Sequence, residues 1–91
     1  MVHEPARYMV LAYLYVVESA DFLFILNETG LTKGNLSSHM SKLEDVGYIR
    51  VKKDFRGKKP HTMLKITVKG RRAFEEYRKT MSKMLSPLDL K

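Results

Sequence analysis

Side chains suited to hydrogen bonding gather in residues 31–47. Leu36, Met40 and Leu43 recur there at helical spacing, which predicts a helix with one buried face. Gly47 is placed to end this helix in a left-handed turn. The N-cap residue, the opposite face and its flanks carry short polar groups and one cation. These residues are Thr32, Asn35, Ser37, Ser38, His39, Ser41 and Lys42. Their chemistry is that of hydrogen bonding to an ordered partner, although a solvated face without a partner accounts for this stretch equally well.

No set of residues has the spacing that catalysis or metal binding requires. The serines of residues 37–41 lack a plausible base and a third orienting group. The histidines at positions 3, 39 and 61 do not show the spacing of metal ligands, and the sequence contains no Cys. Residues 30–35 match neither the dinucleotide fingerprint nor the P-loop. We therefore expect no catalytic residue, no metal site, no cofactor and no enzymatic activity.

The positive charge of the chain is concentrated in its second half. Net charge is +7 overall, with a pI near 9.8. Arg7 is the only Lys or Arg among the first 31 residues, against four acidic residues, whereas residues 50–83 hold thirteen basic residues against three acidic ones. Such a field attracts polyanions. Nucleic acid is the favoured partner class, ahead of an anionic membrane surface or a merely solvated basic surface.

Length and composition predict one small globular domain spanning residues 1–91. The absence of Cys is compatible with a reducing compartment. The apolar run of residues 8–17 is about half as long as a membrane-spanning helix requires, and no basic segment precedes it as in a signal peptide. We expect a soluble, cytoplasmic protein without a membrane partner.

Helical signals dominate the first half of the chain. Pro5 suits the first turn of a helix that continues through residues 6–17 and is apolar nearly all round. Asp21 can cap a second helix that ends at Gly30. Only a short Gly-containing turn separates this helix from the Thr32 cap. Two short helices joined in this way predict a helix-turn-helix over about residues 21–47.

A basic hairpin is expected over about residues 48–67. Residues 48–54 and 63–68 alternate apolar and polar side chains, as half-buried antiparallel strands do. The loop between them contains Gly57 as a turn former and Pro60, which we expect to stop the sheet. Its cations are Arg56, Lys58 and Lys59. The predicted fold class is mainly α with a small antiparallel β-hairpin, a winged helix-turn-helix.

A last helix is predicted over about residues 68–86, stopped by Pro87. Its apolar residues form a narrow seam at spacings of three and four, which either closes the monomer core or meets a second subunit. We favour a dimer contact shared with the apolar first helix. The expected interface residues are Tyr8, Leu11, Tyr15, Phe74, Tyr77, Met81 and Met84.

In this order of elements the sequence resembles winged helix-turn-helix transcriptional regulators of the MarR and ArsR kind, especially their small, single-domain, dimeric relatives. The most specific segments are residues 3–7, 30–49 and 66–71. The resemblance implies that polar residues at the start of the recognition helix touch DNA, here Asn35, Ser37, Ser38, His39 and Lys42, with Arg56, Lys58 and Lys59 as wing contacts. The metal sensing of many ArsR proteins is not implied, because the chain has no Cys.

Two functions from different classes are consistent with these residues. The first is a homodimeric regulator that binds double-stranded DNA sequence-specifically, with the recognition helix in the major groove and the wing on the adjacent backbone. The second is a winged-helix module that binds protein or RNA in a transcription or chromatin assembly. A small-molecule effector between the first and last helices is a further possibility, although packing explains the aromatic residues there equally well: Tyr8, Tyr13, Tyr15 and Phe74.

Overall fold

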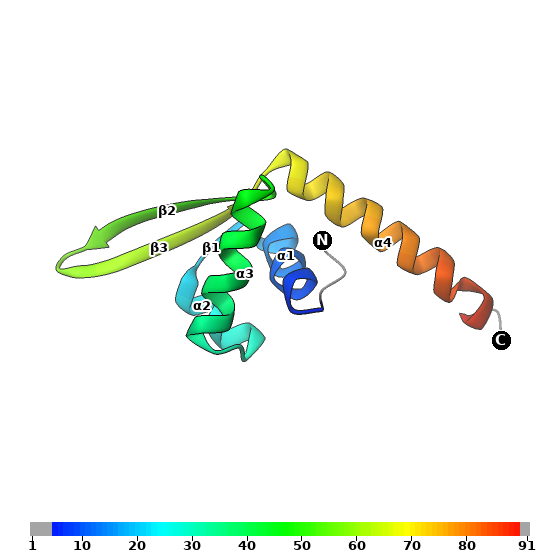
Figure 1. The fold of residues 1–91 in the computed structure, drawn as a ribbon, viewed down its shortest axis with the longest axis horizontal. Coiled ribbons are helices and arrows are strands. Elements are labelled where there is room, and N and C mark those ends of the chain that lie inside the picture. Colours follow the sequence, from blue (N-terminus) through cyan, green and yellow to red (C-terminus); the bar gives the residue numbers. More distant parts are fainter. Residues whose placement is uncertain (1–4, 90–91) are drawn as a thin grey trace.

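Four helices and a three-stranded antiparallel sheet form the structure, a computed structural model that describes the backbone of residues 5–89 and the side chains of residues 5–83. The elements are α1 (Pro5–Val17), β1 (Ser19–Asp21), α2 (Phe22–Thr29), α3 (Lys33–Asp45), β2 (Ile49–Arg56), β3 (Lys59–Ile66) and α4 (Val68–Asp89). Figure 1 shows α1, α2 and α3 gathered below one end of the sheet, with the β2–β3 hairpin and α4 extending in opposite directions. The predicted winged helix-turn-helix architecture is confirmed.

The sheet has the order β1-β3-β2, and its first strand was not expected. β1 is only three residues long and pairs with β3 from Ser19 opposite Lys65 to Asp21 opposite Met63. Asp21 also caps α2 as predicted, because its Oδ1 accepts a hydrogen bond of 2.7 Å from the backbone N–H of Phe24. β1 therefore places the start of α2 directly beside the base of the hairpin.

The hairpin is longer than the sequence indicated. The loop expected between the strands of residues 48–54 and 63–68 is reduced to the turn at Gly57 and Lys58, and Pro60 lies within β3 opposite Phe55. Because β1 pairs with β3 only as far as Met63, one edge of β3 is free at Pro60. A free strand edge is where a sheet tolerates a residue without a backbone N–H. The prediction that Pro60 stops the sheet is therefore wrong.

The core lies where the three short helices and α4 meet the base of the sheet. Every helix and strand contributes to it, and its members are Val10, Leu11, Leu14, Ala20, Ile25, Leu36, Met40, Leu43, Ile49, Leu64, Ile66 and Phe74. Leu36, Met40 and Leu43 bury one face of α3, as their spacing predicts. Leu11 is fully buried and Phe74 is nearly so. The prediction that Leu11 and Phe74 lie at a subunit interface is corrected, because both side chains are enclosed by the core of their own chain.

α4 is the longest element and begins at a well-defined cap. The hydroxyl of Thr67 accepts a hydrogen bond from the N–H of Gly70 at 3.0 Å and donates one to the carbonyl oxygen of Gly47 at 2.6 Å. The helix continues through Pro87 to Asp89, so the predicted stop at Pro87 is wrong. A proline this close to a helix end removes one donor and leaves only two residues to follow. No helix among residues 5–89 has the length and apolar character needed to cross a membrane.

Candidate nucleic-acid interface

The exposed face of α3 is polar along its whole length. Thr32 caps the helix, its Oγ1 accepting a hydrogen bond of 3.1 Å from the N–H of Asn35. Five of the residues predicted to bind DNA follow on the exposed surface: Asn35, Ser37, Ser38, Ser41 and Lys42. No large hydrophobic side chain is exposed on α3. The helix therefore presents hydrogen-bonding groups outward, while its apolar side fixes it to the core.

The turn before α3 sets its position relative to α2. Gly30 ends α2 in the left-handed conformation with φ 71°, and its N–H donates to the carbonyl oxygen of Leu26. The N–H of Leu31 donates to the hydroxyl of Thr29 at 3.3 Å, and the Leu31 side chain packs against the core. Residues 30–32 are thus the tight turn that the sequence predicted between the two helices.

His39 differs from the other predicted DNA contacts. It is half-buried, on the flank of α3 next to α1, and its Nδ1 accepts a hydrogen bond of 3.2 Å from Nε of Arg7. Helical geometry accounts for this placement, because residue 39 lies one turn after the buried Leu36 and beside the buried Met40. The structure gives His39 a partner within the chain and separates it from the exposed row of Asn35, Ser38 and Lys42.

The predicted wing cations lie at the tip of the β2–β3 hairpin, which extends beyond the helices (Figure 1). Arg56 and Lys59 are directly opposite each other across the two strands, and Lys58 lies in the turn that joins them. All three side chains are exposed. Like charges at directly opposed strand positions destabilise a hairpin. A bound polyanion would offset this repulsion.

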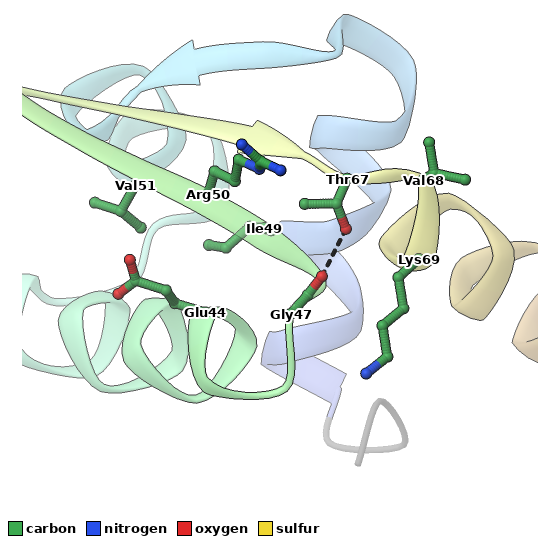
Figure 2. A pocket seen from close by; sticks show the side chains of 8 residues that line it. All are labelled: Glu44, Gly47, Ile49, Arg50, Val51, Thr67, Val68 and Lys69. Atoms are coloured by element: carbon green, nitrogen blue, oxygen red, sulfur yellow. Dashed lines mark hydrogen bonds between the residues drawn. The ribbon is translucent and has the colours of Figure 1, made fainter.

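A second opposed pair of cations lies at the base of the wing and was not among the predicted site residues. Arg50 and Lys65 face each other across β2 and β3 and are both exposed. Figure 2 shows Arg50 beside an open groove between the end of α3, β2 and the start of α4, where Lys69 and Glu44 also lie. The alternating apolar and basic residues of the hairpin were the available signal for Arg50 and Lys65.

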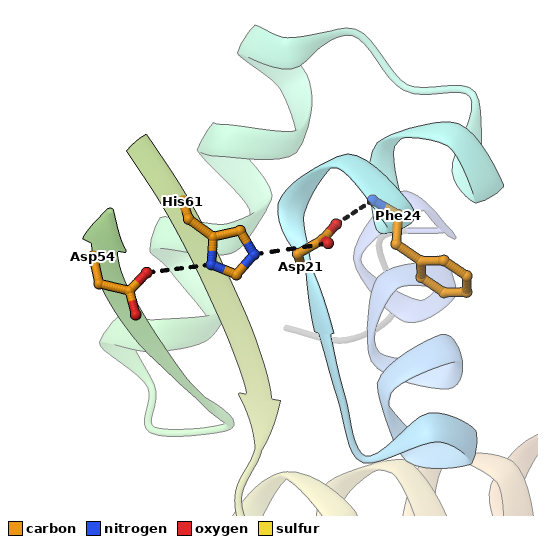
Figure 3. A network of polar contacts seen from close by, with 4 residues as sticks. All are labelled: Asp21, Phe24, Asp54 and His61. Carbon is orange, nitrogen blue, oxygen red and sulfur yellow. Dashed lines mark hydrogen bonds and ion pairs between the residues drawn. The ribbon is translucent and has the colours of Figure 1, made fainter. Parts of the chain in front are cut away.

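A histidine connects the wing to the helix-turn-helix. Figure 3 shows His61 of β3 between two carboxylates, with Nδ1 3.2 Å from Oδ1 of Asp54 and Nε2 3.8 Å from Oδ2 of Asp21. Asp54 belongs to β2, and Asp21 is the N-cap of α2. His61 lies inside the hairpin, where it is paired with Asp54 in the register of β2 and β3. The carboxylates of Asp54 and Asp21 are thus both engaged with His61.

Aromatic side chains fill the space between α1 and α4. The ring of Tyr8 lies 5.2 Å from that of Phe74 and 4.8 Å from that of Tyr77, and Tyr15 lies 4.6 Å from Phe74. The hydroxyl of Tyr15 donates a hydrogen bond of 2.7 Å to Oε2 of Glu75. This hydrogen bond, followed by burial and the charge of Glu75, raises the pKa of Tyr15 above its ordinary value of 10.0.

These contacts bear on two expectations from the sequence. The rings of Tyr8, Tyr15 and Phe74 pack on one another where an effector crevice was considered, as the packing interpretation holds. Tyr8, Tyr15 and Tyr77 remain half-buried in the single chain and Met81 is exposed. Met84 lies outside the residues whose side chains the structure describes.

Comparison with known proteins agrees with this geometry. A family model described as a winged helix DNA-binding domain matches residues 6–85. An uncharacterized protein of Methanocaldococcus jannaschii is 41% identical over 71 residues, which cover 78% of this chain and 77% of that protein. The solved structure of a transcriptional regulator homologue from Pyrococcus horikoshii has a TM-score of 0.89 at 27% identity, covering 97% of this chain and 87% of that chain.

A more distant neighbour shares the fold. The PcaV transcriptional regulator from Streptomyces coelicolor, solved in complex with its natural ligand, has a TM-score of 0.72 at 20% identity and covers 91% of this chain and 61% of that chain. The structural neighbours thus include transcriptional regulators, as the resemblance implied. The polar α3, the basic hairpin and the family match over residues 6–85 agree: the chain belongs to the winged helix DNA-binding domain family.

Proposed function

We propose that this protein is a sequence-specific, double-stranded DNA-binding transcriptional regulator that acts as a homodimer. In this proposal α3 enters the major groove, where Asn35, Ser37 and Ser38 meet base edges. Thr32, Ser41 and Lys42 lie nearer the phosphates, and the wing cations Arg56, Lys58 and Lys59 neutralise the adjacent backbone. His39 has a positioning role, because it holds α3 against α1 through Arg7.

The observation that supports DNA most strongly is the presence of two complementary surfaces in one domain. The polar face of α3 has no exposed large hydrophobic side chain, which disfavours a protein-binding groove. Beside it, the hairpin carries two directly opposed pairs of cations, Arg50 with Lys65 and Arg56 with Lys59. Hydrogen-bonding groups and uncompensated positive charge together are the two requirements of groove reading and phosphate binding.

The dimer proposal is supported by the shape of α4 and by exposed apolar surface. α4 extends well beyond the body of the domain (Figure 1), and an isolated helix is only marginally stable in water. Met81 on this helix and Met9, Val16 and Val17 on α1 are exposed. A second copy would cover this surface, and a two-fold axis would place two α3 helices about one duplex turn apart. Leu11 and Phe74 are omitted from the proposed interface because they are buried in the chain.

The proposal allows for a small-molecule effector and involves no membrane. PcaV was solved with its natural ligand. In this chain, however, packing between α1 and α4 accounts for Tyr8, Tyr15 and Phe74. A cytoplasmic location stays the expectation drawn from the sequence.

Two measurements test the proposal. Fluorescence anisotropy of a labelled duplex, titrated with protein at several salt concentrations, should show affinity that falls linearly with the logarithm of salt, with a slope of about 0.9 per neutralised phosphate. Sedimentation equilibrium of the free protein should give twice the mass of 10.6 kDa. A monomeric mass at protein concentrations that saturate DNA would contradict the dimer. Tighter binding to a matched RNA duplex would favour the alternative function, a winged-helix module that binds RNA.

A further inference from the structure

One face of the hairpin continues the core outward into an uncovered apolar tip. In β2 the residues on this face are Ile49, Val51, Lys53 and Phe55, since side chains alternate along a strand. Ile49 is buried and Val51 packs against the core, so this is the face that looks toward the helices. Phe55 therefore lies on the same side of the sheet as α3, farther out along the wing.

The cross-strand partner of Phe55 extends the apolar surface. Pro60 lies directly opposite Phe55 in the register of β2 and β3, and directly opposed residues share a face. Phe55 is 71% exposed and Pro60 is also exposed. Most of the phenyl ring is therefore in water. No element among residues 5–89 covers it, so packing within the chain does not account for an aromatic residue at this position.

Cations surround this apolar tip and indicate what covers it. Lys53 lies on the same face as Phe55, two residues inward, and Lys58 is in the turn immediately beyond. Arg56 and Lys59 flank it on the opposite face. A protein partner would bring apolar surface and would have to neutralise or bury these charges. A duplex offers the complementary combination, with sugar and base edges in the minor groove between two rows of phosphates.

We infer that Phe55 and Pro60 form an apolar wedge that enters the minor groove of the duplex whose major groove receives α3. This inference rests on the proposed function. Apolar side chains that enter the minor groove partly unstack a base step and bend the duplex toward the major groove. The wedge thereby favours sequences with a deformable step, such as TA or CA, at the position that the wing reaches. Lys53, Arg56, Lys58 and Lys59 hold the phosphates on either side of it.

The test compares Phe55→Thr with Phe55→Trp, using a duplex labelled at both ends so that energy transfer reports its bend. Thr keeps a strand-forming residue at this exposed position but removes the ring, whereas Trp keeps an aromatic wedge. Val68→Thr, which removes a 66% exposed apolar side chain from the start of α4, is the matched control. Circular dichroism verifies the fold, and sedimentation verifies the oligomeric state of each variant.

The wild type should bend the duplex, and Phe55→Thr should lose the bend and bind about tenfold or more weakly, as expected for re-exposing one phenyl ring. Its salt slope should not change, because no phosphate contact is lost. Phe55→Trp and Val68→Thr should behave like the wild type. Wild-type binding and bending that Phe55→Thr leaves intact would overturn the inference, as would loss of self-association in Phe55→Thr, which would place a second copy on the wedge. Failure of the wild type to bind any duplex would instead contradict the proposed function.

Discussion

The guanidinium Nε of Arg7 donates a hydrogen bond to Nδ1 of His39 across 3.2 Å, and this contact joins α1 to α3. In this contact Nδ1 of the imidazole is the acceptor, so this nitrogen carries no proton. The contact fixes the orientation of α3 from its inner flank. It separates residues that hold this helix from residues that face outward.

Removing the His39 ring should therefore affect stability more than sequence preference. We predict that His39→Ala lowers the free energy of unfolding by about 1 kcal/mol, equivalent to about 4–8 °C in Tm. Thermal unfolding measures the first quantity, and binding to a panel of duplexes measures the preference. A variant with unchanged Tm and altered base preference would instead assign His39 to base reading.

The outward residues of α3 should show the opposite behaviour. Ser38→Ala and Asn35→Ala remove exposed side chains, so we predict little change in Tm but a changed ranking of duplex sequences. Competition between the preferred duplex and single-base variants gives this ranking. Uniform weakening across all sequences would assign both side chains to phosphate contacts.

The wing cations should contribute affinity without selectivity, and at a cost in stability. Lys59 lies opposite Arg56, so Lys59→Thr should raise the free energy of unfolding by about 0.2–1 kcal/mol through relief of repulsion. The same change should weaken binding to all duplexes and reduce the salt slope by about 0.9. Lys58→Ala should reduce affinity similarly. Lys79→Thr, an exposed change on α4, is the matched control and should leave binding unaltered.

Two glycines should respond in opposite directions to alanine. A Cβ at Gly70 would overlap the carbonyl oxygen of Tyr48, so Gly70→Ala should destabilise the fold by about 1–3 kcal/mol. A Cβ at Gly34 would meet no atom within 4 Å outside its own chain neighbours and the nearby backbone of α3, and alanine is the better helix former, so Gly34→Ala should stabilise α3 by up to about 1 kcal/mol. Urea unfolding compares the two. Equal effects would contradict the close approach of α4 to the base of the wing.

The hydrogen bond from Tyr15 to Glu75 predicts a loss of stability in alkali. Because the bond raises the pKa of Tyr15 in the folded protein, its contribution is fully present below the ordinary tyrosine pKa of about 10 and is lost as pH rises above it. Tyr15→Phe should reduce stability at neutral pH and flatten this alkaline decline. Absorbance titration at about 295 nm and unfolding at several pH values measure both effects. An unchanged alkaline decline in the variant would show that Tyr15 does not contribute.

The sequence predicted the helix-turn-helix well because its signals are local. Thr32 and Asp21 are caps whose hydrogen bonds span three residues, and Gly30 marks a left-handed helix end. β1 lacks such a signal, since three residues cannot show alternation and are ordered only by pairing with residues far along the chain. The sequence predicted too short a wing, because a strand accepts a proline such as Pro60 only at a free edge. Which edge of β3 is free depends on its pairing with β1.

The types of the site residues could be predicted from the sequence, but the directions in which their side chains point were harder to predict. The spacing of the buried residues separated the two faces of α3, yet a flank position such as 39 is decided by what α1 brings to it, here Arg7. The apolar α1 gave no indication of which side meets the core, so Leu11 was assigned to an interface although the monomer buries it. Phe55 was not among the predicted site residues, because its exposure follows from the extension of the hairpin past the helices.

Selection of bound duplexes from a random pool tests the central claim, that α3 reads a sequence as part of a two-fold dimer. The account predicts a pseudo-palindromic site whose half-sites are about 10 base pairs apart, centre to centre, as two recognition helices on one face of the duplex require. Ser38→Ala should shift the selected bases within each half-site and leave this spacing unchanged. Recovery of no preferred sequence, or of a single site without two-fold symmetry, would contradict it.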